Sequence, residues 1–412
     1  MEGLKAILLI GDGMADRPVP KLGARTPLEA ADNDNMNTLA LQGECGLMDP
    51  IAPGIRAGSD TSHLAILGYD PFTTYTGRGP FEAAGIGMDV RKGDIAFRCN
   101  FATVDEDMVV LDRRAGRIEE GTHELAAAVH GMQIEDVTCY FKESVAHRGA
   151  LVLRGPGLGA GVTDTDPHET TVKVHEAEAT APNDEASTKT ARIVNEFTRR
   201  SYELLKEHPV NKKRRADGKP PANIILPRGA GLAPHLESFT EKYSLKPAAV
   251  VETGLIAGIA AYLGMDIVHV PEATGGPDSD VTAIGRAVIK ALDDYNFVLC
   301  NVKGCDVAGH DGDPDAKVQL IERLDKMVGM LVDAADEYTY IILTADHSTP
   351  IAVRDHSGDP VPIAFWGPGI RIDSTQAFDE RSVVGGGLLR IRGVDIMNIL
   401  TNLMTVQPKY GA

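Results

Sequence analysis

KAILLIGDG, Lys5 to Gly13, is the stretch that decides the fold of this chain. Its unbroken apolar run, which ends in a glycine turn, is typical of a strand buried on both faces of a parallel sheet. Three later runs have the same form, and they are FVLCNVKG (297–304), YIILTADH (340–347) and PIAFWGPG (362–369). The sequence therefore predicts a sheet of short, fully buried strands.

Helical patterns alternate with these runs. Residues 315–335 carry one apolar stripe at intervals of three and four, which is typical of a helix packed against a core. The members of the stripe are Val318, Ile321, Leu324, Val328 and Leu331. Similar patterns occupy residues 122–132, 253–265 and 282–295. We therefore expect an α/β fold, in which a mostly parallel sheet is sandwiched by helices and joined by right-handed crossovers.

The length of the chain favours two domains, because 412 residues are more than one hydrophobic core usually serves. The middle of the chain is more polar, and its connections are longer. We expect a discontinuous domain of residues 1–78 and 243–412, interrupted by a smaller inserted α/β domain of residues 79–242. Within the insert, the basic run at residues 212–215 lies beside a Pro-Pro pair and is expected to be a solvated surface loop rather than an anion site.

Charge and composition exclude several classes of protein. The chain holds 59 acidic and 41 basic residues, a formal net charge of −18, whereas a nucleic-acid surface needs clustered basic charge. Its apolar runs are shorter than the ~20 residues that a membrane span needs. The beginning of the chain does not resemble a secretory signal, and the five cysteines are scattered. We expect a reduced, cytoplasmic protein that binds neither nucleic acid nor membrane; the sequence carries no signal of oligomeric state.

Acidic and imidazole side chains gather where the predicted strands end. Because open parallel sheets carry their sites beyond the carboxyl ends of the strands, these side chains should lie at one edge. They are Asp12, Asp306, His310, Asp346, His347 and His356. Each alone also fits a turn, a surface position or a helix cap. Together, carboxylate and imidazole ligands suit Mn²⁺ or Zn²⁺, whereas Mg²⁺ favours oxygen alone, and two such ions can clamp the oxygens of a phosphoryl transfer.

AGSDTSHLAILG, which starts at Ala57, offers a nucleophile for that chemistry. If a helix begins near Ser59, the serine hydroxyl projects from the positive end of the helix dipole, where phosphate is favoured. A metal at that hydroxyl would lower its pKa. Ordinary capping is assigned to the three residues that follow, Asp60, Thr61 and Ser62. His63 is expected to support its neighbours rather than to bind metal.

A series of motifs resembles those of the alkaline-phosphatase superfamily, and in chain order they are GDGMADRP, GSDTSH, DVAGH, TADHS and DHSGDPVP. Within that superfamily the chain is similar, nearly from end to end, to the cofactor-independent phosphoglycerate mutases of the archaeal type. Further segments that read like that group are GRGPFEAAGIGM, GDIAFRCNFATV and VVETGLIAG. The resemblance implies an alkaline-phosphatase-like sheet that binds metals, with an inserted domain that binds substrate and assists the transfer.

The resemblance also implies a reaction, the interconversion of 2-phosphoglycerate and 3-phosphoglycerate in glycolysis and gluconeogenesis. Ser59 would carry the phosphoryl group in each turnover, and no 2,3-bisphosphoglycerate would be needed. Two divalent ions are implied, Mn²⁺ first, with Zn²⁺, Co²⁺ and Mg²⁺ as alternatives. One ion would be held by Asp12, Ser59, Asp346 and His347, and the other by Asp306, His310 and His356.

The inserted domain is expected to supply the ligands of the phosphoglycerate. Carboxylates and phosphates favour arginine, whose planar fork binds two oxygens. The candidate substrate-binding residues are Arg113, Arg114, Arg117, Asp164, Asn223 and Arg228. The resemblance points to TDTDPHET, residues 163–170, for the general acid or base, with Asp166 and His168 as catalytic candidates. The alternative role of the arginines is a surface or structural ion pair.

Two other functions fit parts of the pattern. A metal-dependent phosphatase or phosphotransferase of the same superfamily would use the same metals and serine on another phosphorylated metabolite. The size and basicity of the inserted domain favour the mutase over this alternative. A non-catalytic metal-binding protein would lack the nucleophile, and Ser59 is present.

Overall fold

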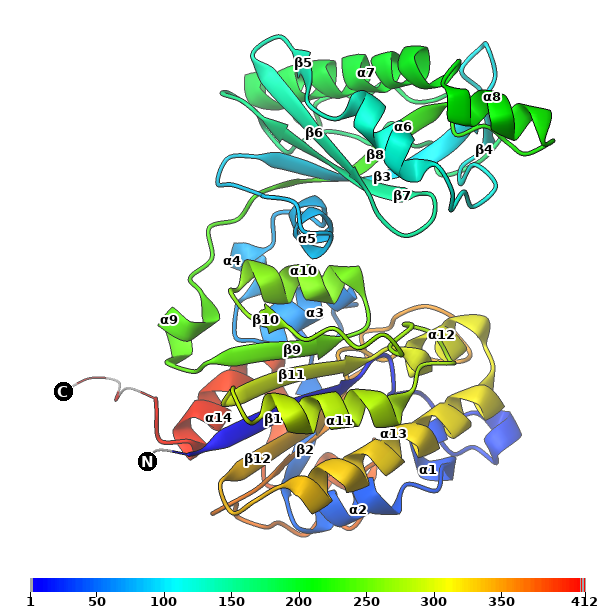
Figure 1. Ribbon diagram of the computed structural model, residues 1–412. Coiled ribbons are helices and arrows are strands. Elements are labelled where there is room, and N and C mark those ends of the chain that lie inside the picture. The colour runs from blue at the N-terminus through cyan, green and yellow to red at the C-terminus, as the bar shows by residue number, and fades with distance from the viewer. Residues whose placement is uncertain (1–2, 408, 410, 412) are drawn as a thin grey trace. The chain divides into compact units, whose positions relative to one another are not determined.

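Figure 1 shows the computed structural model, which describes residues 3–407, 409 and 411. The chain forms two compact units. The discontinuous unit comprises the residues up to Tyr75 and those from Leu236, and the inserted unit is Thr76–His235. The two boundaries at which the chain passes from one unit to the other lie a few residues earlier in the sequence than the expected 78/79 and 242/243. The second does so because helix α9 (Phe239–Tyr243) packs on the discontinuous unit, where the Phe239 ring lies 4.6 Å from that of Phe297.

The discontinuous unit is built on an eight-stranded sheet with the order β10-β9-β11-β1-β12-β13-β2-β14. Its strands are β1 (Lys5–Gly11), β2 (Glu44–Asp49), β9 (Pro247–Val251), β10 (Asp266–Ile267), β11 (Phe297–Val302), β12 (Thr339–Thr344), β13 (Val361–Trp366) and β14 (Leu389–Arg392). Strands β11, β1 and β12 are neighbours and run parallel, and almost all of their residues are buried. This confirms the expected α/β class with a mostly parallel sheet.

Strand β13 departs from the prediction of parallel strands. It pairs antiparallel with both of its neighbours, β12 and β2. The connection from β12, residues 345–360, consists of turns and loops, so the chain returns without the helical crossover that a parallel neighbour requires. Apolar content predicted that this segment is a buried strand but not its direction.

Helices cover this sheet, and the longest confirms the predicted apolar stripe. The helices are α1 (Pro27–Ala30), α2 (Asp34–Leu41), α3 (Ser59–Ile66), α4 (Pro71–Thr74), α9, α10 (Gly254–Tyr262), α11 (Val281–Ala291), α12 (Gly304–Asp311), α13 (Pro314–Ala334) and α14 (Ile396–Leu403), with 3₁₀ turns η1 (Pro20–Leu22), η2 (Ser382–Gly385) and η3 (Gly393–Asp395). Helices α11, α13 and α2 pack side by side, and α3 packs against α10 and η3 (Figure 1). On α13, Ile321, Leu324, Val328 and Leu331 are buried, while Val318 is half-buried.

The inserted unit has its own sheet, and every strand pair in its ladder is antiparallel. Its elements are α5 (Gly79–Gly85), β3 (Ile95–Val104), β4 (Val110–Asp112), α6 (Thr122–Val129), β5 (Met132–Ile134), β6 (Val137–Glu143), β7 (Arg148–Arg154), α7 (Glu185–Leu205), α8 (Pro209–Ala216) and β8 (Ile224–Leu232). Phe97, Phe101, Phe141 and Phe197 form the core between sheet and helices. Among the described residues, parallel strand pairs are therefore found in the sheet of the discontinuous unit and not in that of the inserted unit.

The basic run expected to be a loop is helical, because α8 spans it. Pro209 stands in the first turn, where its missing N–H costs nothing, and the His208 side chain accepts a hydrogen bond from the backbone N–H of Val210. The buried Asn211 side chain anchors the helix by donating to the carbonyls of Leu205 and Ala222. Local capping and one buried amide thus make this polar run a helix, although its sequence predicted a loop.

All five cysteines are free and buried, as expected of thiols in a reduced protein. Within residues 3–407, 409 and 411, the helices fall short of the length and hydropathy that crossing a bilayer would require.

Candidate active site

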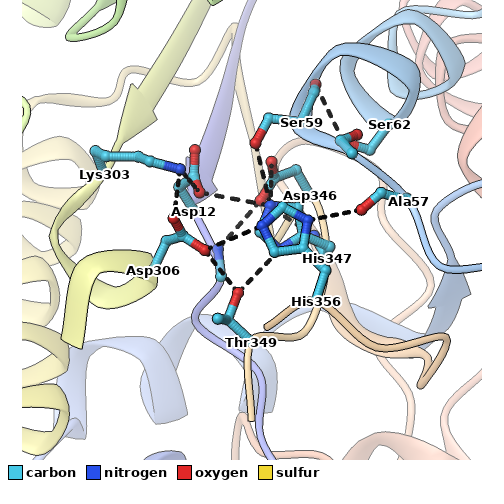
Figure 2. Close-up of polar contacts among 12 residues, drawn as sticks. Asp12, Ala57, Ser59, Ser62, Lys303, Asp306, Asp346, His347, Thr349 and His356 are labelled. Carbon is cyan, nitrogen blue, oxygen red and sulfur yellow. Dashed lines mark hydrogen bonds and ion pairs between the residues drawn. The ribbon is translucent and has the colours of Figure 1, made fainter. Parts of the chain in front are cut away.

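The predicted metal-ligating residues meet at one edge of the large sheet because β11, β1 and β12 are adjacent and parallel. Asp12 follows β1, Asp306 lies in the first turn of α12 after β11, and His347 follows β12. The His347 Nε2 atom lies 3.7 Å from Asp12 Oδ1. Figure 2 shows these side chains converging from three separate parts of the chain. Sequence positions about three hundred residues apart are therefore brought into one small volume.

Asp306, His310 and His356 form the first candidate metal group, in which the ligand atoms all lie within 4.8 Å of one another. The Nε2 atoms of His310 and His356 lie 3.4 and 3.5 Å from Asp306 Oδ1. Each ring places Nδ1 against a backbone carbonyl, that of Arg354 at 3.0 Å and that of Ala57 at 2.8 Å. A carbonyl only accepts, so Nδ1 of each ring carries a proton, and in the neutral ring a lone pair is left on Nε2. This is the arrangement of a metal-ligating histidine.

The second candidate group consists of Asp12, Asp306 and His347, again with ligand atoms within 4.8 Å of one another. It therefore shares Asp306 with the first group, where the resemblance implied Ser59 and Asp346 instead. Those two residues are close by, since Ser59 Oγ lies 3.2 Å and Asp346 Oδ2 3.3 Å from His347 Nε2. Asp346 Oδ2 is buried and without a hydrogen-bond partner among the described residues. A buried carboxylate oxygen without a partner fits a cation at this point.

The cluster brings several carboxylates together in a buried environment, and the pKa values of its side chains are shifted accordingly. Burial and the neighbouring Asp346 carboxylate raise the pKa of Asp12. Burial lowers the pKa of His347 to about 3, which leaves the imidazole neutral and able to bind metal. The Nζ atom of Lys303 lies 2.8 Å from Asp12 Oδ1 and 2.6 Å from Asp306 Oδ2. Burial opposes the charge of Lys303, but these carboxylates outweigh it and raise the pKa of the lysine.

Ser59 is the first residue of helix α3 and lies beside this cluster. Two neighbours accept from backbone N–H groups of this terminus, since Thr61 Oγ1 accepts from the Gly58 N–H and Asp60 Oδ1 accepts from the Thr61 N–H. Ser62, which was also expected to cap, instead donates to the Gly58 carbonyl. The Ser59 hydroxyl is left to face His347 (Figure 2). One short segment therefore begins a helix and presents a serine hydroxyl to the candidate metal ligands.

His63 has the supporting position that was expected of it. Its Nδ1–H donates to the Ser59 carbonyl at 2.7 Å, and its Nε2 accepts from Asn301 Nδ2 at 3.2 Å. The same Asn301 nitrogen also donates to Asp12 Oδ2 at 3.1 Å. All of these side chains except that of Ser59 are fully buried. The backbone of the serine is thus joined to a metal-ligand candidate by two hydrogen-bonding side chains.

Sequence analysis missed three residues of this cluster: Asn301, Lys303 and Thr349. Asn301 had a signal, since it is the one polar residue within the apolar run FVLCNV. Lys303 had a weaker signal, as the cation that follows the same strand. Thr349 had none, because the turn that places it is visible only in the structure.

A fully buried ion pair holds the loops that carry the candidate ligands. Lys317 Nζ donates to Asp16 Oδ2 at 2.8 Å and to the carbonyls of Ala15 and Thr349 at 3.1 and 3.0 Å. Lys317 is 0% exposed and Asp16 is 6% exposed. The lysine ties the loop after Asp12 to the loop after His347.

We expect the substitution Lys317→Met to lower the free energy of unfolding by about 3–5 kcal/mol, because it leaves the Asp16 carboxylate buried without its cation. The measurement is urea denaturation followed by circular dichroism. The control is Lys326→Met on the exposed face of the same helix α13, which should change stability by less than ~0.5 kcal/mol. Equal stability of the two variants would contradict this role of Lys317.

The inserted unit holds a basic cavity of about 610 Å³. Strand register explains it: Arg98 and Asn100 point to the same face of β3, Arg228 of β8 lies opposite Arg98, and Arg148 of β7 lies opposite Asn100. The remaining lining residues are Arg113, Arg114, Arg117, Glu119, Val145, Ala146, His147 and His168. Arg98, Asn100, His147 and Arg148 were missed, although two polar residues at a spacing of two in FRCNF carried a signal.

Several polar atoms of this cavity are buried without a hydrogen-bond partner among the described residues: Arg98 Nε, Asn100 Oδ1, His147 Nδ1 and Arg228 Nε, of which the last lies 3.7 Å from Asp166 Oδ2. Burial, followed by the charge of neighbouring arginines such as Arg228, lowers the pKa of Arg98 to about 10. The same causes, burial and then Arg148, lower the pKa of His147 to about 4. A bound anion would relieve both the repulsion and the unmade hydrogen bonds.

The other candidates of the insert fall into three arrangements. Arg113 donates to both oxygens of Asp166 at 2.9 and 2.7 Å, so this carboxylate is buried in a two-pronged ion pair that overcomes burial and lowers its pKa. His168 Nε2 contacts Asp164 Oδ2 at 2.9 Å and is more exposed. Asn223 is elsewhere: its side chain pairs with both backbone groups of Val104 and closes the end of the sheet.

Several known proteins with similar sequences share one description. A family model described as 2,3-bisphosphoglycerate-independent phosphoglycerate mutase matches residues 40–211. The 2,3-bisphosphoglycerate-independent phosphoglycerate mutase 1 of Methanothermobacter thermautotrophicus is 55% identical and covers 99% of this chain and 100% of its own. A solved Pyrococcus horikoshii protein has a TM-score of 0.86 at 38% identity and covers 100% of both chains.

A second solved structure carries a functional description. The cofactor-independent phosphoglycerate mutase of Thermoplasma acidophilum has a TM-score of 0.73 at 38% identity and covers 97% of this chain and 99% of its own. These likenesses run along nearly the whole chain and are not confined to the site motifs. The chain belongs to the 2,3-bisphosphoglycerate-independent phosphoglycerate mutase family.

Proposed function

We propose that this protein interconverts 2-phosphoglycerate and 3-phosphoglycerate through a phosphoserine at Ser59, with two divalent metal ions and without 2,3-bisphosphoglycerate. The observation that carries the proposal is the position of Ser59 Oγ, at the first residue of α3 and 3.2 Å from His347 Nε2. A nucleophile beside a cluster of metal ligands is what phosphoryl transfer requires. Membership of the family supports the choice of substrate.

The residues assigned to the metals are those whose donor atoms converge. Asp306, His310 and His356 would hold one ion, and Asp12, Asp346, His347 and Ser59 the other, with Asp306 placed to contact both ions. When bound, the two ions supply positive charge that acidifies the serine hydroxyl and offsets the charge of the phosphoryl oxygens. Carboxylate and imidazole donors suit Mn²⁺, with Zn²⁺, Co²⁺ and Mg²⁺ as alternatives.

In the reaction, Ser59 Oγ attacks the phosphorus of 3-phosphoglycerate. Ser59 loses its hydroxyl proton as the bond from its oxygen to phosphorus forms, the bond to the 3-oxygen of glycerate breaks, and that oxygen takes up a proton. The glycerate then turns so that its 2-hydroxyl attacks the phosphoserine and loses its proton. Ser59 is regenerated, and the same steps run in reverse from 2-phosphoglycerate. Exclusion of water is essential, because water in place of the hydroxyl would release free phosphate.

The basic cavity of the inserted unit is assigned to the acid groups of the phosphoglycerate. Arg98, Arg113 and Arg228 offer guanidinium donors, and Nε of both Arg98 and Arg228 is buried without a hydrogen bond among the described residues. Asp166 is committed to Arg113 and so orients that arginine. His168, with Asp164 behind its ring, is the better placed of the two catalytic candidates to move a hydroxyl proton.

We expect the substitution Arg98→Gln to raise KM for 3-phosphoglycerate by roughly 10- to 100-fold, with a smaller change in kcat, because it removes a charged hydrogen bond from binding. Steady-state kinetics at saturating Mn²⁺ measures both constants. The matched control is Arg199→Gln on α7, where the arginine is exposed and paired with Glu196. Identical KM values for the two variants would remove Arg98 from the substrate site.

The activity itself is tested by incubating purified protein with Mn²⁺ and 3-phosphoglycerate, with no bisphosphoglycerate added. Formation of 2-phosphoglycerate and of free phosphate is followed in parallel. We expect 2-phosphoglycerate as the main product and loss of activity on chelation. Free phosphate as the main product would replace the mutase by a phosphatase.

We place the enzyme in the cytoplasm, where its free thiols stay reduced.

A further inference from the structure

Thr349 contacts a residue of each proposed metal site with a single hydroxyl. Its Oγ1 lies 2.7 Å from Asp306 Oδ1 and 3.1 Å from His347 Nδ1 (Figure 2). Asp306 belongs to the set with His310 and His356, and His347 belongs to the set that includes Asp12. Thr349 is 0% exposed. The hydroxyl therefore has these two ligands as its surroundings and not bulk water.

The direction of both hydrogen bonds follows from what each group can do. A carboxylate ligand only accepts, so the single hydroxyl proton of Thr349 goes to Asp306 Oδ1. Toward His347 the threonine oxygen can then only accept, so Nδ1 of the imidazole must carry the ring proton. A lone pair is left on Nε2, the atom that faces Ser59 Oγ at 3.2 Å and Asp346 Oδ2 at 3.3 Å. This is the tautomer that binds metal through Nε2.

We propose that Thr349 is a positioning residue that fixes the tautomer of His347 and the orientation of Asp306, and so constrains one ligand of each metal site at once. The inference rests on the metal-binding role proposed above. It goes beyond that role because the Thr349 hydroxyl binds neither ion itself but constrains a ligand of each. Removing the hydroxyl should free the ring of His347 to choose its tautomer and free Asp306 Oδ1 to rotate.

The rest of Thr349 is held independently of its hydroxyl. Its carbonyl accepts from Lys317 Nζ at 3.0 Å, and its N–H donates to the Ala15 carbonyl at 3.3 Å. The methyl group packs so closely on Gly309 that a Cβ there would lie 2.8 Å from Thr349 Cγ2. Valine has the shape of threonine and keeps this packing. The substitution Thr349→Val therefore removes the two hydrogen bonds with little other change.

The test compares the binding of Mn²⁺ to the wild type, Thr349→Val and Thr349→Ser by titration calorimetry. We expect Thr349→Val to lower the affinity for both ions by roughly 10- to 100-fold. Thr349→Ser, which restores the hydroxyl, should bind both ions with an affinity within about 3-fold of the wild type. The matched control is Thr344→Val on β12, which removes another fully buried threonine hydroxyl, one that donates to the Pro362 carbonyl on β13. The control should bind both ions as the wild type does.

A second measurement does not depend on any variant at residue 349. In Zn²⁺-loaded protein labelled with ¹⁵N-histidine, the His347 signal is assigned by its absence from His347→Gln. We expect the proton on Nδ1. A proton on Nε2 would overturn the inference. In the titration, it would be overturned by a Thr349→Val protein that binds both ions as tightly as the wild type, or by one whose affinity is lowered for one ion only. A wild type that binds no divalent ion would overturn the metal role itself, and with it this inference.

Discussion

Replacing Ser59 by alanine is expected to lower kcat for the conversion of 3-phosphoglycerate by ~10⁵-fold or more, since a covalent nucleophile has no substitute in its site. The Ser59 hydroxyl is the one oxygen of its helix terminus that faces His347 rather than the backbone. The fold should be unaffected, because Thr61 and Asp60 make the side-chain hydrogen bonds to the backbone N–H groups of this terminus. Coupled assay of 2-phosphoglycerate gives the rate.

The matched control for this prediction is Ser62→Ala. Ser62 lies on the same helix, one turn further on, and its hydroxyl donates to the Gly58 carbonyl. Its loss should cost about 1 kcal/mol of stability and leave kcat within a few-fold. A Ser59→Ala protein that keeps more than about one hundredth of the wild-type kcat would contradict the nucleophile assignment.

The substitution Asp306→Asn is expected to remove both metal ions and to lower kcat by at least ~10³-fold, because metal charge contributes several kcal/mol to such a transfer. Asp306 is common to both candidate groups, and its second oxygen pairs with Lys303. Metal content by atomic emission and kcat at saturating Mn²⁺ are the two measurements. Chelation of the wild type should have the same effect on rate and should be reversed by added Mn²⁺.

The control for Asp306→Asn is Asp333→Asn, which alters an exposed aspartate near the end of α13. It makes the same change of one charge without touching the cluster, so metal content and kcat should stay at wild-type values. An Asp306→Asn protein that retains two tightly bound ions would show that this carboxylate is not shared between the sites.

The metal cluster was predictable from sequence for a geometrical reason. Asp12, Asp306, Asp346 and His347 follow apolar runs that read as parallel strands, and parallel strands end at one edge of a sheet. The reasoning needed only the position of each strand end and not the strand order. Lys303 and Thr349 were missed because their roles depend on the path of the chain after the strand, which apolar patterning does not encode.

The basic cavity was only half predictable, because pairing register is not written in a single strand. Arg113 and Arg228 were found through their clusters or strand ends, whereas Arg98 and Arg148 join them only through the pairing of β3 with β7 and β8. Asn223 read as a substrate ligand, but its amide is used to close the sheet. Strand direction was missed for the same reason, since the apolar content of β13 is equally compatible with an antiparallel pairing.

Transfer through Ser59 is tested most directly by rapid quenching of the Mn²⁺-loaded protein after it is mixed with 3-phosphoglycerate, followed by peptide mass spectrometry. The account predicts that phosphate appears on the peptide that contains Ser59, and that it appears at a rate no slower than kcat. Phosphate on another residue, or phosphorylation of Ser59 more slowly than 2-phosphoglycerate is formed, would contradict it.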